Sequence, residues 1–73
     1  MNIEIVKEEL NNHLGRDVTI KYNLGRNKYE SYNVRIKKLY NYIFLVEMLD
    51  VESNEIKSFS YSDIITETIK IDY

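Results

Sequence analysis

Residues 3–22 read IEIVKEELNNHLGRDVTIKY, and their hydrophobic period changes at Gly15. Four apolar side chains precede this glycine at spacings of three, four and four residues: Ile3, Val6, Leu10 and Leu14. Such spacing places them in one stripe of an amphipathic helix. Asn2 can cap the start of this helix, and Gly15 suits the left-handed backbone that follows a helix end. The stretch therefore predicts a helix over residues 3–13, followed by a strand that begins near Val18.

Beyond Gly15, apolar and polar side chains alternate, which is typical of strands that bury one face. The alternation predicts five strands, over residues 18–22, 32–37, 43–49, 56–61 and 66–73. The third segment is the most apolar, and we expect a central strand buried on both faces. Between the strands we expect a loop over 23–27, an irregular segment over 39–42, a tight turn over 52–55, and a short helical turn that Ser62 or Asp63 caps and that ends at Ile65.

One helix, five short strands and a helical turn before the last strand predict a mainly β fold. A sheet this small removes its exposed edges by curling. We expect a small five-stranded SH3-like (Sm-like) barrel, with the N-terminal α-helix over one open end and residues 1–73 in one domain. The alternative is an OB-fold, but the helix of that fold lies between the third and fourth strands, where residues 50–55 leave no room. The helical stripe should pack against Val18, Ile20, Val34, Ile36, Phe44, Val46, Ile69 and Ile71.

The composition excludes several classes of protein. The 73 residues include no cysteine, so disulfide scaffolds and thiolate zinc sites are excluded. The longest apolar run, residues 43–46, is far shorter than the about 20 residues of a membrane-spanning helix. Glu4, Glu8 and Glu9 are unlike the basic start of a signal peptide. We therefore expect a soluble, cytoplasmic protein with no cofactor and no metal.

Catalytic residues are not evident in the sequence. His13 has no motif partner beyond Glu9, one turn earlier, and its place near the helix C-terminus suits a cation. The carboxylates lack the spacing of a calcium-binding loop. The glycine between Asn23 and Lys28 belongs to neither a Walker motif nor a dinucleotide-binding motif. We do not expect an enzyme.

The net charge of −2 conceals a basic middle and an acidic end. Residues 18–44 carry six cations against Glu30 alone, for +5, whereas residues 45–73 carry two lysines against seven acids, for −5. Cations interleaved with tyrosines are typical of grooves that bind single-stranded nucleic acid, although solvation and core packing explain the same residues. The candidate residues for binding a partner or nucleic acid are Arg16, Lys21, Arg26, Lys28, Tyr29, Arg35, Lys37, Tyr40 and Tyr42.

Three stretches resemble the Veg family of small bacterial proteins: LGR at 14–16 with VTIK at 18–21, GRNK at 25–28, and SYSDIITETI at 60–69. The last is the most specific, and we expect its Tyr61 to pack beneath the helical turn with its hydroxyl on a backbone partner. The resemblance covers nearly the whole chain. It implies a small SH3-like barrel without known catalytic activity, associated with stimulating biofilm formation by opposing a transcriptional repressor. The family loop usually reads Gly-Gly-Arg-Arg/Lys-Lys. Here Leu24 replaces a glycine and Asn27 replaces a cation, which weakens a phosphate-binding interpretation.

Two alternative functions follow, of which we favour the first. The first is a regulatory module that docks on a protein partner such as a transcriptional repressor. The second is a nucleic-acid-binding barrel that uses the basic loop and second strand. One contiguous patch would favour phosphate binding, whereas scattered cations would favour protein docking. The cations concerned are Arg16, Lys21, Arg26, Lys28, Arg35 and Lys37. Exposed edge strands could also pair two copies into a homo-oligomer.

Overall fold

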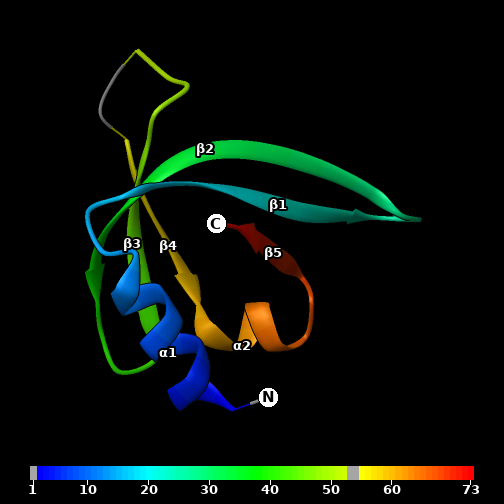
Figure 1. Ribbon diagram of the computed structural model, residues 1–73. Helices are drawn as coiled ribbons and strands as arrows, with labels where there is room; N and C mark the ends of the chain where they lie inside the picture. The colour runs from blue at the N-terminus through cyan, green and yellow to red at the C-terminus, as the bar shows by residue number, and fades with distance from the viewer. Residues whose placement is uncertain (1, 53–54) are drawn as a thin grey trace.

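The computed structural model describes residues 2–52 and 55–73 (Figure 1). Its elements are α1 (Ile3–Asn12), β1 (Asp17–Gly25), β2 (Lys28–Leu39), β3 (Ile43–Met48), β4 (Ile56–Ser60), α2 (Tyr61–Ile65) and β5 (Ile69–Asp72). The predicted mainly β fold with one N-terminal helix and five strands is confirmed. Residues 53–54 of the turn predicted over 52–55 lie outside the described residues.

The five strands form one antiparallel sheet in the order β4-β3-β2-β1-β5. α2 directly links β4 to β5, the two edges of this sheet, so the sheet curls to bring its edges toward each other (Figure 1). The second helix thus precedes the last strand, as in an SH3-like barrel. In the described part of the chain no helix lies between β3 and β4, where an OB-fold would have one.

The concave face of the sheet and the two helices enclose the core. Its buried apolar side chains are Val6, Leu10, Val18, Ile20, Val34, Ile36, Phe44, Val46, Met48, Tyr61 and Ile69. α1 contributes two of them and packs against α2 and β2. Ile3 and Ile71 are half-buried and pack on the core, as predicted. Tyr61 is buried with its hydroxyl on a backbone carbonyl, as predicted, and Met48 belongs to the strand that was expected to be buried.

α1 ends one residue earlier than predicted, with His13 as its C-cap. Leu14 therefore leaves the helical stripe, is 47% exposed, and does not belong to the core. Gly15 follows with φ of +80°, a left-handed conformation that glycine adopts without strain. Its N–H donates to the carbonyl of Ile36 at 2.8 Å, which fixes the entry of the chain into β1.

β3 buries one face, not two. Phe44, Val46 and Met48 are buried, whereas Ile43 is 39% exposed. β3 is an interior strand in its hydrogen bonding, paired with both β2 and β4. The prediction of burial on both faces was wrong because only the concave face of this sheet is packed, as is common in antiparallel sheets.

β1 and β2 form a hairpin that is longer than predicted and projects from the rest of the molecule (Figure 1). The segment predicted as a loop is mostly strand. The turn consists of Arg26 and Asn27, with φ of +51° and +61°. Positive φ at both central residues is characteristic of a type I′ turn, whose twist matches that of the strands. A bulge at Leu24 absorbs one residue between the Asn23–Tyr29 and Gly25–Lys28 pairs.

α2 begins after Ser60, rather than at the predicted Ser62 or Asp63. The Ser60 hydroxyl accepts a hydrogen bond from the backbone N–H of Asp63 at 3.1 Å. The Asp63 carboxylate accepts one from the backbone N–H of Ser60 at 3.4 Å. This capping box stabilises the first turn of the helix and ends β4 one residue before the predicted boundary.

β5 is shorter than predicted. Thr66 forms the C-cap of α2, and Glu67 has a positive φ of 61°. These residues turn the chain, so regular pairing with β1 begins at Ile69. The expected alternation holds within the strand, where Ile69 is buried and Lys70 is exposed.

Candidate functional site

The outer, convex face of the sheet carries mostly polar side chains, because the apolar residues of each strand point to the core. Its cross-strand pairs are Asp17–Arg35, Thr19–Asn33 and Lys21–Ser31 between β1 and β2, and Thr19–Asp72 and Lys21–Lys70 between β1 and β5. The charge of this face therefore changes along the strands, from acidic near Asp17 and Asp72 to basic near Lys21 and Lys70.

At the basic end, Lys21 and Lys70 are directly opposite each other. Within residues 2–52 and 55–73 neither ammonium group forms an ion pair. The Lys70 Nζ lies 5.3 Å from the centre of the Tyr29 ring, a cation–π contact. Like charges directly opposite each other destabilise a sheet by an amount on the order of 0.2–1 kcal/mol. This pair therefore costs stability unless an anion neutralises it.

Arg26 and Lys28 extend this basic region to the tip of the hairpin. Arg26 occupies a left-handed turn position, where glycine, asparagine and aspartate are preferred. A side chain with a Cβ costs about 1 kcal/mol or more in that conformation. We call Lys21, Arg26, Lys28, Tyr29 and Lys70 together the basic hairpin surface.

The other cations predicted for binding lie at the opposite end of the sheet, and two of them are neutralised. The Arg35 Nε donates to the Asp17 carboxylate at 2.8 Å, and this hydrogen bond raises the pKa of Arg35. The Lys37 Nζ lies 3.8 Å from the Glu47 carboxylate. Arg16 precedes β1, and its carbonyl accepts from the Ile36 N–H at 3.1 Å. The six predicted cations are therefore not gathered in one patch.

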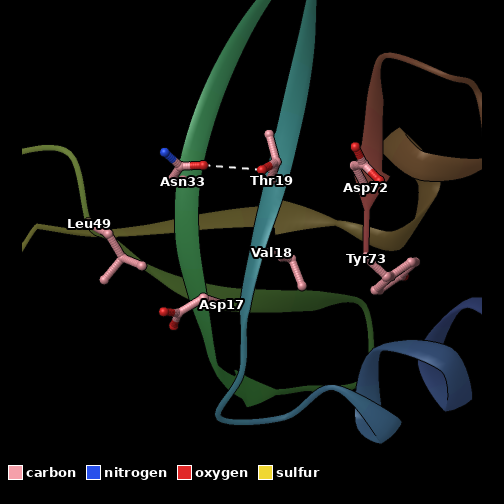
Figure 2. Close-up of a pocket in the computed structure, with 7 residues that line it drawn as sticks. All are labelled: Asp17, Val18, Thr19, Asn33, Leu49, Asp72 and Tyr73. Carbon is pink, nitrogen blue, oxygen red and sulfur yellow. Dashed lines mark hydrogen bonds between the residues drawn. The ribbon is translucent and has the colours of Figure 1, made fainter.

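The acidic end of the outer face contains a shallow hollow of about 400 Å³ (Figure 2). Its floor is crossed by a hydrogen bond from the Thr19 hydroxyl to the Asn33 amide oxygen, 3.1 Å long. Asp72, on β5, lies beside Thr19 (Figure 2). The Asp17 carboxylate accepts a hydrogen bond from Arg35 on β2. In the part of the chain that the structure describes, no group of three or more histidine or carboxylate side chains could hold a metal ion.

Tyr40 and Tyr42 lie on the tight turn between β2 and β3, residues 40–43, which we call the tyrosine turn. Three hydrogen bonds fix its backbone. The Tyr40 N–H donates to the Ile43 carbonyl at 2.8 Å, the Tyr61 hydroxyl donates to the Tyr40 carbonyl at 2.5 Å, and the Tyr61 N–H donates to the Tyr42 carbonyl at 3.2 Å. Tyr61 itself is fully buried and its ring stacks on Phe44, with ring centres 5.7 Å apart. The turn is therefore anchored to the core, while Tyr42 remains 75% exposed.

Two hollows lie beside the tyrosine turn, along α1. The first has a volume of about 630 Å³ and is lined by Lys7, residues 39–42 and Ile43. The second has a volume of about 470 Å³ and is lined by Lys7, Leu39 and three polar residues of α1. Since they share Lys7 and Leu39, they form one groove between the helix and the turn.

His13 packs against the C-terminal residue of the chain. Its ring lies 4.4 Å from the ring of Tyr73, between centres. Its Nδ1 donates to the Glu9 carbonyl at 3.0 Å, because a carbonyl can only accept. Burial, with a smaller effect of the Glu9 charge, raises the pKa of Tyr73 to about 12. These contacts give His13 a structural role at the end of α1.

The structure thus separates the predicted binding residues into two groups and a remainder. Lys21, Arg26, Lys28 and Tyr29 all belong to the hairpin, and Tyr40 and Tyr42 both belong to the turn between β2 and β3. Sequence reasoning missed Lys70, which completes the basic hairpin surface, and Lys7, which lines the groove. The alternation of Ile69, Lys70 and Ile71 could have placed Lys70 on the outer face, but not opposite Lys21.

No helix among the described residues is long and apolar enough to cross a membrane. A family model described as the biofilm formation stimulator VEG matches residues 1–72 of the 73-residue chain. A search of curated proteins finds no match. The match spans almost the whole chain, and the chain therefore belongs to the VEG family, as the three sequence stretches predicted.

Proposed function

We propose that this member of the VEG family is a non-enzymatic, cytoplasmic regulatory module that acts by binding a protein partner, such as a transcriptional repressor, through the tyrosine turn. The family is described by its stimulation of biofilm formation rather than by a reaction. A small barrel that regulates without catalysis needs a recognition surface.

The observation that carries this proposal is the exposure of Tyr42 on a rigid turn. Tyrosine is enriched among the residues that dominate protein–protein affinity, because it contributes a large contact area with few rotatable bonds. Here 75% of Tyr42 is accessible. The hydrogen bonds of Tyr61 hold the backbone beneath it, which lowers the entropy that docking must remove.

The surroundings of the turn fit the same role. Ile43 is 39% exposed and Tyr40 is 41% exposed, so the turn presents a small apolar and aromatic surface. The groove between this turn and α1 adds Leu39 and the aliphatic stem of Lys7. An aromatic centre with a charged rim is typical of protein interfaces.

The side chains best suited to catalysis support a non-enzymatic role. His13 is engaged by the Glu9 carbonyl and the Tyr73 ring. Asp17, in the hollow of the outer face, is engaged by Arg35. Neither has the paired nucleophile and base that acyl or phosphoryl transfer would require.

The test is a pull-down from a lysate of the source cells, treated with nuclease, with Tyr42→Ala as the variant and Tyr29→Ala as the matched control. Both substitutions remove a partly exposed tyrosine, but from different surfaces. A partner identified by mass spectrometry is then purified and titrated against each protein. We expect Tyr42→Ala to weaken binding by about tenfold or more, which corresponds to a loss of about 1.4 kcal/mol or more. Equal affinity for Tyr42→Ala and the wild type, or loss of every partner on nuclease treatment, would refute docking through the turn.

A further inference from the structure

We infer that the basic hairpin surface is a binding site for the phosphate backbone of nucleic acid, centred on the opposed pair Lys21 and Lys70. This site is separate from the tyrosine turn and goes beyond the proposed protein docking. Lys70 is supplied by β5, nearly fifty residues along the chain from Lys21.

The first observation is the unneutralised charge at the centre of the surface. Lys21 and Lys70 face each other across neighbouring strands without an ion pair in the described ranges. Other cations on the same sheet do have carboxylate partners, namely Arg35 with Asp17 and Lys37 with Glu47. What distinguishes Lys21 and Lys70 is that two cations face each other directly, and no carboxylate in the described ranges relieves their repulsion.

The second observation is the conformation of the hairpin tip. Arg26 adopts φ of +51°, although a residue without charge, such as asparagine or glycine, would fit this turn with less strain. Strain retained at an exposed position points to a functional constraint. Here it keeps a cationic residue at the turn of the hairpin, beyond Lys21 on β1.

The size and composition of the surface indicate which anion it fits. From Lys21 to Gly25 the strand advances about 13 Å, at roughly 3.3 Å per residue. Four cations belong to this length of hairpin and its neighbouring strand, namely Lys21, Arg26, Lys28 and Lys70, so the surface can contact up to four phosphates of a polyanion. A single carboxylate or free phosphate would engage only part of such a track.

The neighbouring side chains also favour a nucleic acid over an acidic protein. Lys21 and Lys70 are accompanied by Asn23, Ser31 and Thr19 on the same face. Lysine and serine are depleted at the centres of protein–protein interfaces, whereas polar, strongly cationic surfaces are typical of nucleic-acid interfaces. Tyr29 adds one ring, but Lys70 lies over it, so contacts to the backbone rather than base stacking should dominate.

The test measures binding of the intact chain to labelled oligothymidylate and to a labelled duplex, each of about 20 nucleotides per strand, by fluorescence anisotropy. The variant is Lys21→Gln with Lys70→Gln. The matched control is Lys37→Gln with Lys57→Gln, which removes the same charge from β2, where Lys37 lies near Glu47, and from the concave side of β4. Circular dichroism verifies the fold of both proteins.

With four phosphate contacts, raising the salt concentration from about 50 to about 200 mM should weaken binding of the single strand by roughly 50-fold. The Lys21→Gln, Lys70→Gln protein should show a salt slope smaller by about 1.4 units, so that the same change weakens its binding roughly 7-fold. The control should retain the wild-type slope. Preference for one probe would identify single strands or duplex as the source of the phosphates.

Three results would overturn the inference: no binding of either probe at about 50 mM salt, equal weakening by the variant and the control, or equal affinity for poly-L-glutamate. The last would assign the surface to an acidic protein. Tyr42→Ala should leave oligonucleotide binding unchanged, so that failure of this site and failure of the proposed docking surface are distinguishable.

Discussion

Tyr61 joins the core to the tyrosine turn, and the substitution Tyr61→Phe tests this connection with the loss of one oxygen atom. The Tyr61 side chain is fully buried, and its hydroxyl donates to the Tyr40 carbonyl at 2.5 Å. Burial raises the pKa of Tyr61, so the hydroxyl remains protonated and able to donate at neutral pH. Phenylalanine would keep the stacking on Phe44 and remove only the hydrogen bond.

The expected cost follows from the lost hydrogen bond and from the Tyr40 carbonyl, which is left without this partner. A hydrogen bond of this kind contributes about 0.5–1.5 kcal/mol, and an acceptor left without a partner adds to the loss, for a total of about 1–2 kcal/mol. In a domain of this size the melting temperature should fall by roughly 4–16 °C. Thermal denaturation followed by circular dichroism measures this change. Tyr22→Phe, which removes a hydroxyl from an exposed tyrosine, is the matched control.

The same substitution should separate the two surfaces. A turn that lacks one of its three hydrogen bonds is more mobile before docking, so docking must remove more conformational entropy. This should weaken partner binding by roughly 2–10-fold. Oligonucleotide binding at the hairpin should not change. If Tyr61→Phe melted at the temperature of the Tyr22→Phe control, the hydroxyl would not hold the turn. If it weakened both kinds of binding equally, the effect would be a general loss of folded protein.

Four further outcomes follow from the packing and charges. Leu10 is fully buried, so Leu10→Ala should lower the free energy of unfolding, measured by urea denaturation, by about 2–5 kcal/mol. An unchanged urea midpoint would mean that α1 is not part of the core. Lys21→Glu should raise the melting temperature by a few degrees at low salt and less at high salt, because it turns the repulsion from Lys70 into attraction; no salt dependence would refute this cause. The pKa of Tyr73 is raised from 10.0 to about 12, so between these pH values the folded chain retains a proton that the unfolded chain releases. The stability that this shift contributes should be full below pH 10 and be lost as the pH rises through 12. Tyr73→Phe should flatten this loss, and an alkaline denaturation profile identical to that of the wild type would contradict the assignment. The opposite charges at the two ends of the outer face should favour weak, salt-sensitive homo-oligomers, and light scattering that shows a monomer at low and physiological salt would exclude them.

Hydrophobic periodicity was sufficient to predict the order of elements and most of the core. The helical stripe of Ile3, Val6 and Leu10 and the alternation in four strands are strong local signals. The predicted ends of the helices and strands were wrong where the local turn residues, rather than the hydrophobic period, determine the backbone. Arg26 accepts a left-handed conformation that its residue type disfavours, so a two-residue turn resembled a longer loop. Ser60 and Asp63 have the spacing of a capping box, and that signal was present in the sequence.

The candidate sites were predicted less well, because they depend on strand register. Whether Arg35 is free or neutralised depends on its pairing with Asp17, and whether Lys70 reinforces Lys21 depends on pairing between β1 and β5. Register across such separations is set by the packing of the whole sheet, and no local pattern records it. Net charge by segment therefore indicated a basic middle but not which of its cations are free.

The two surfaces also differ in what they can achieve alone. The chain carries a net charge of −2, and its acidic final third opposes the approach of a polyanion to Lys21 and Lys70, so binding at the hairpin should be weak at physiological salt. A weak contact gains importance when a second contact holds its ligand nearby, because tethering raises the effective concentration to about the millimolar range. A transcriptional repressor docked at Tyr42 while on DNA would provide such a tether. Under the two proposals together, a protein bound to nucleic acid would suit both surfaces: the tyrosine turn would supply specificity, and the basic hairpin surface would add a salt-dependent increment in affinity.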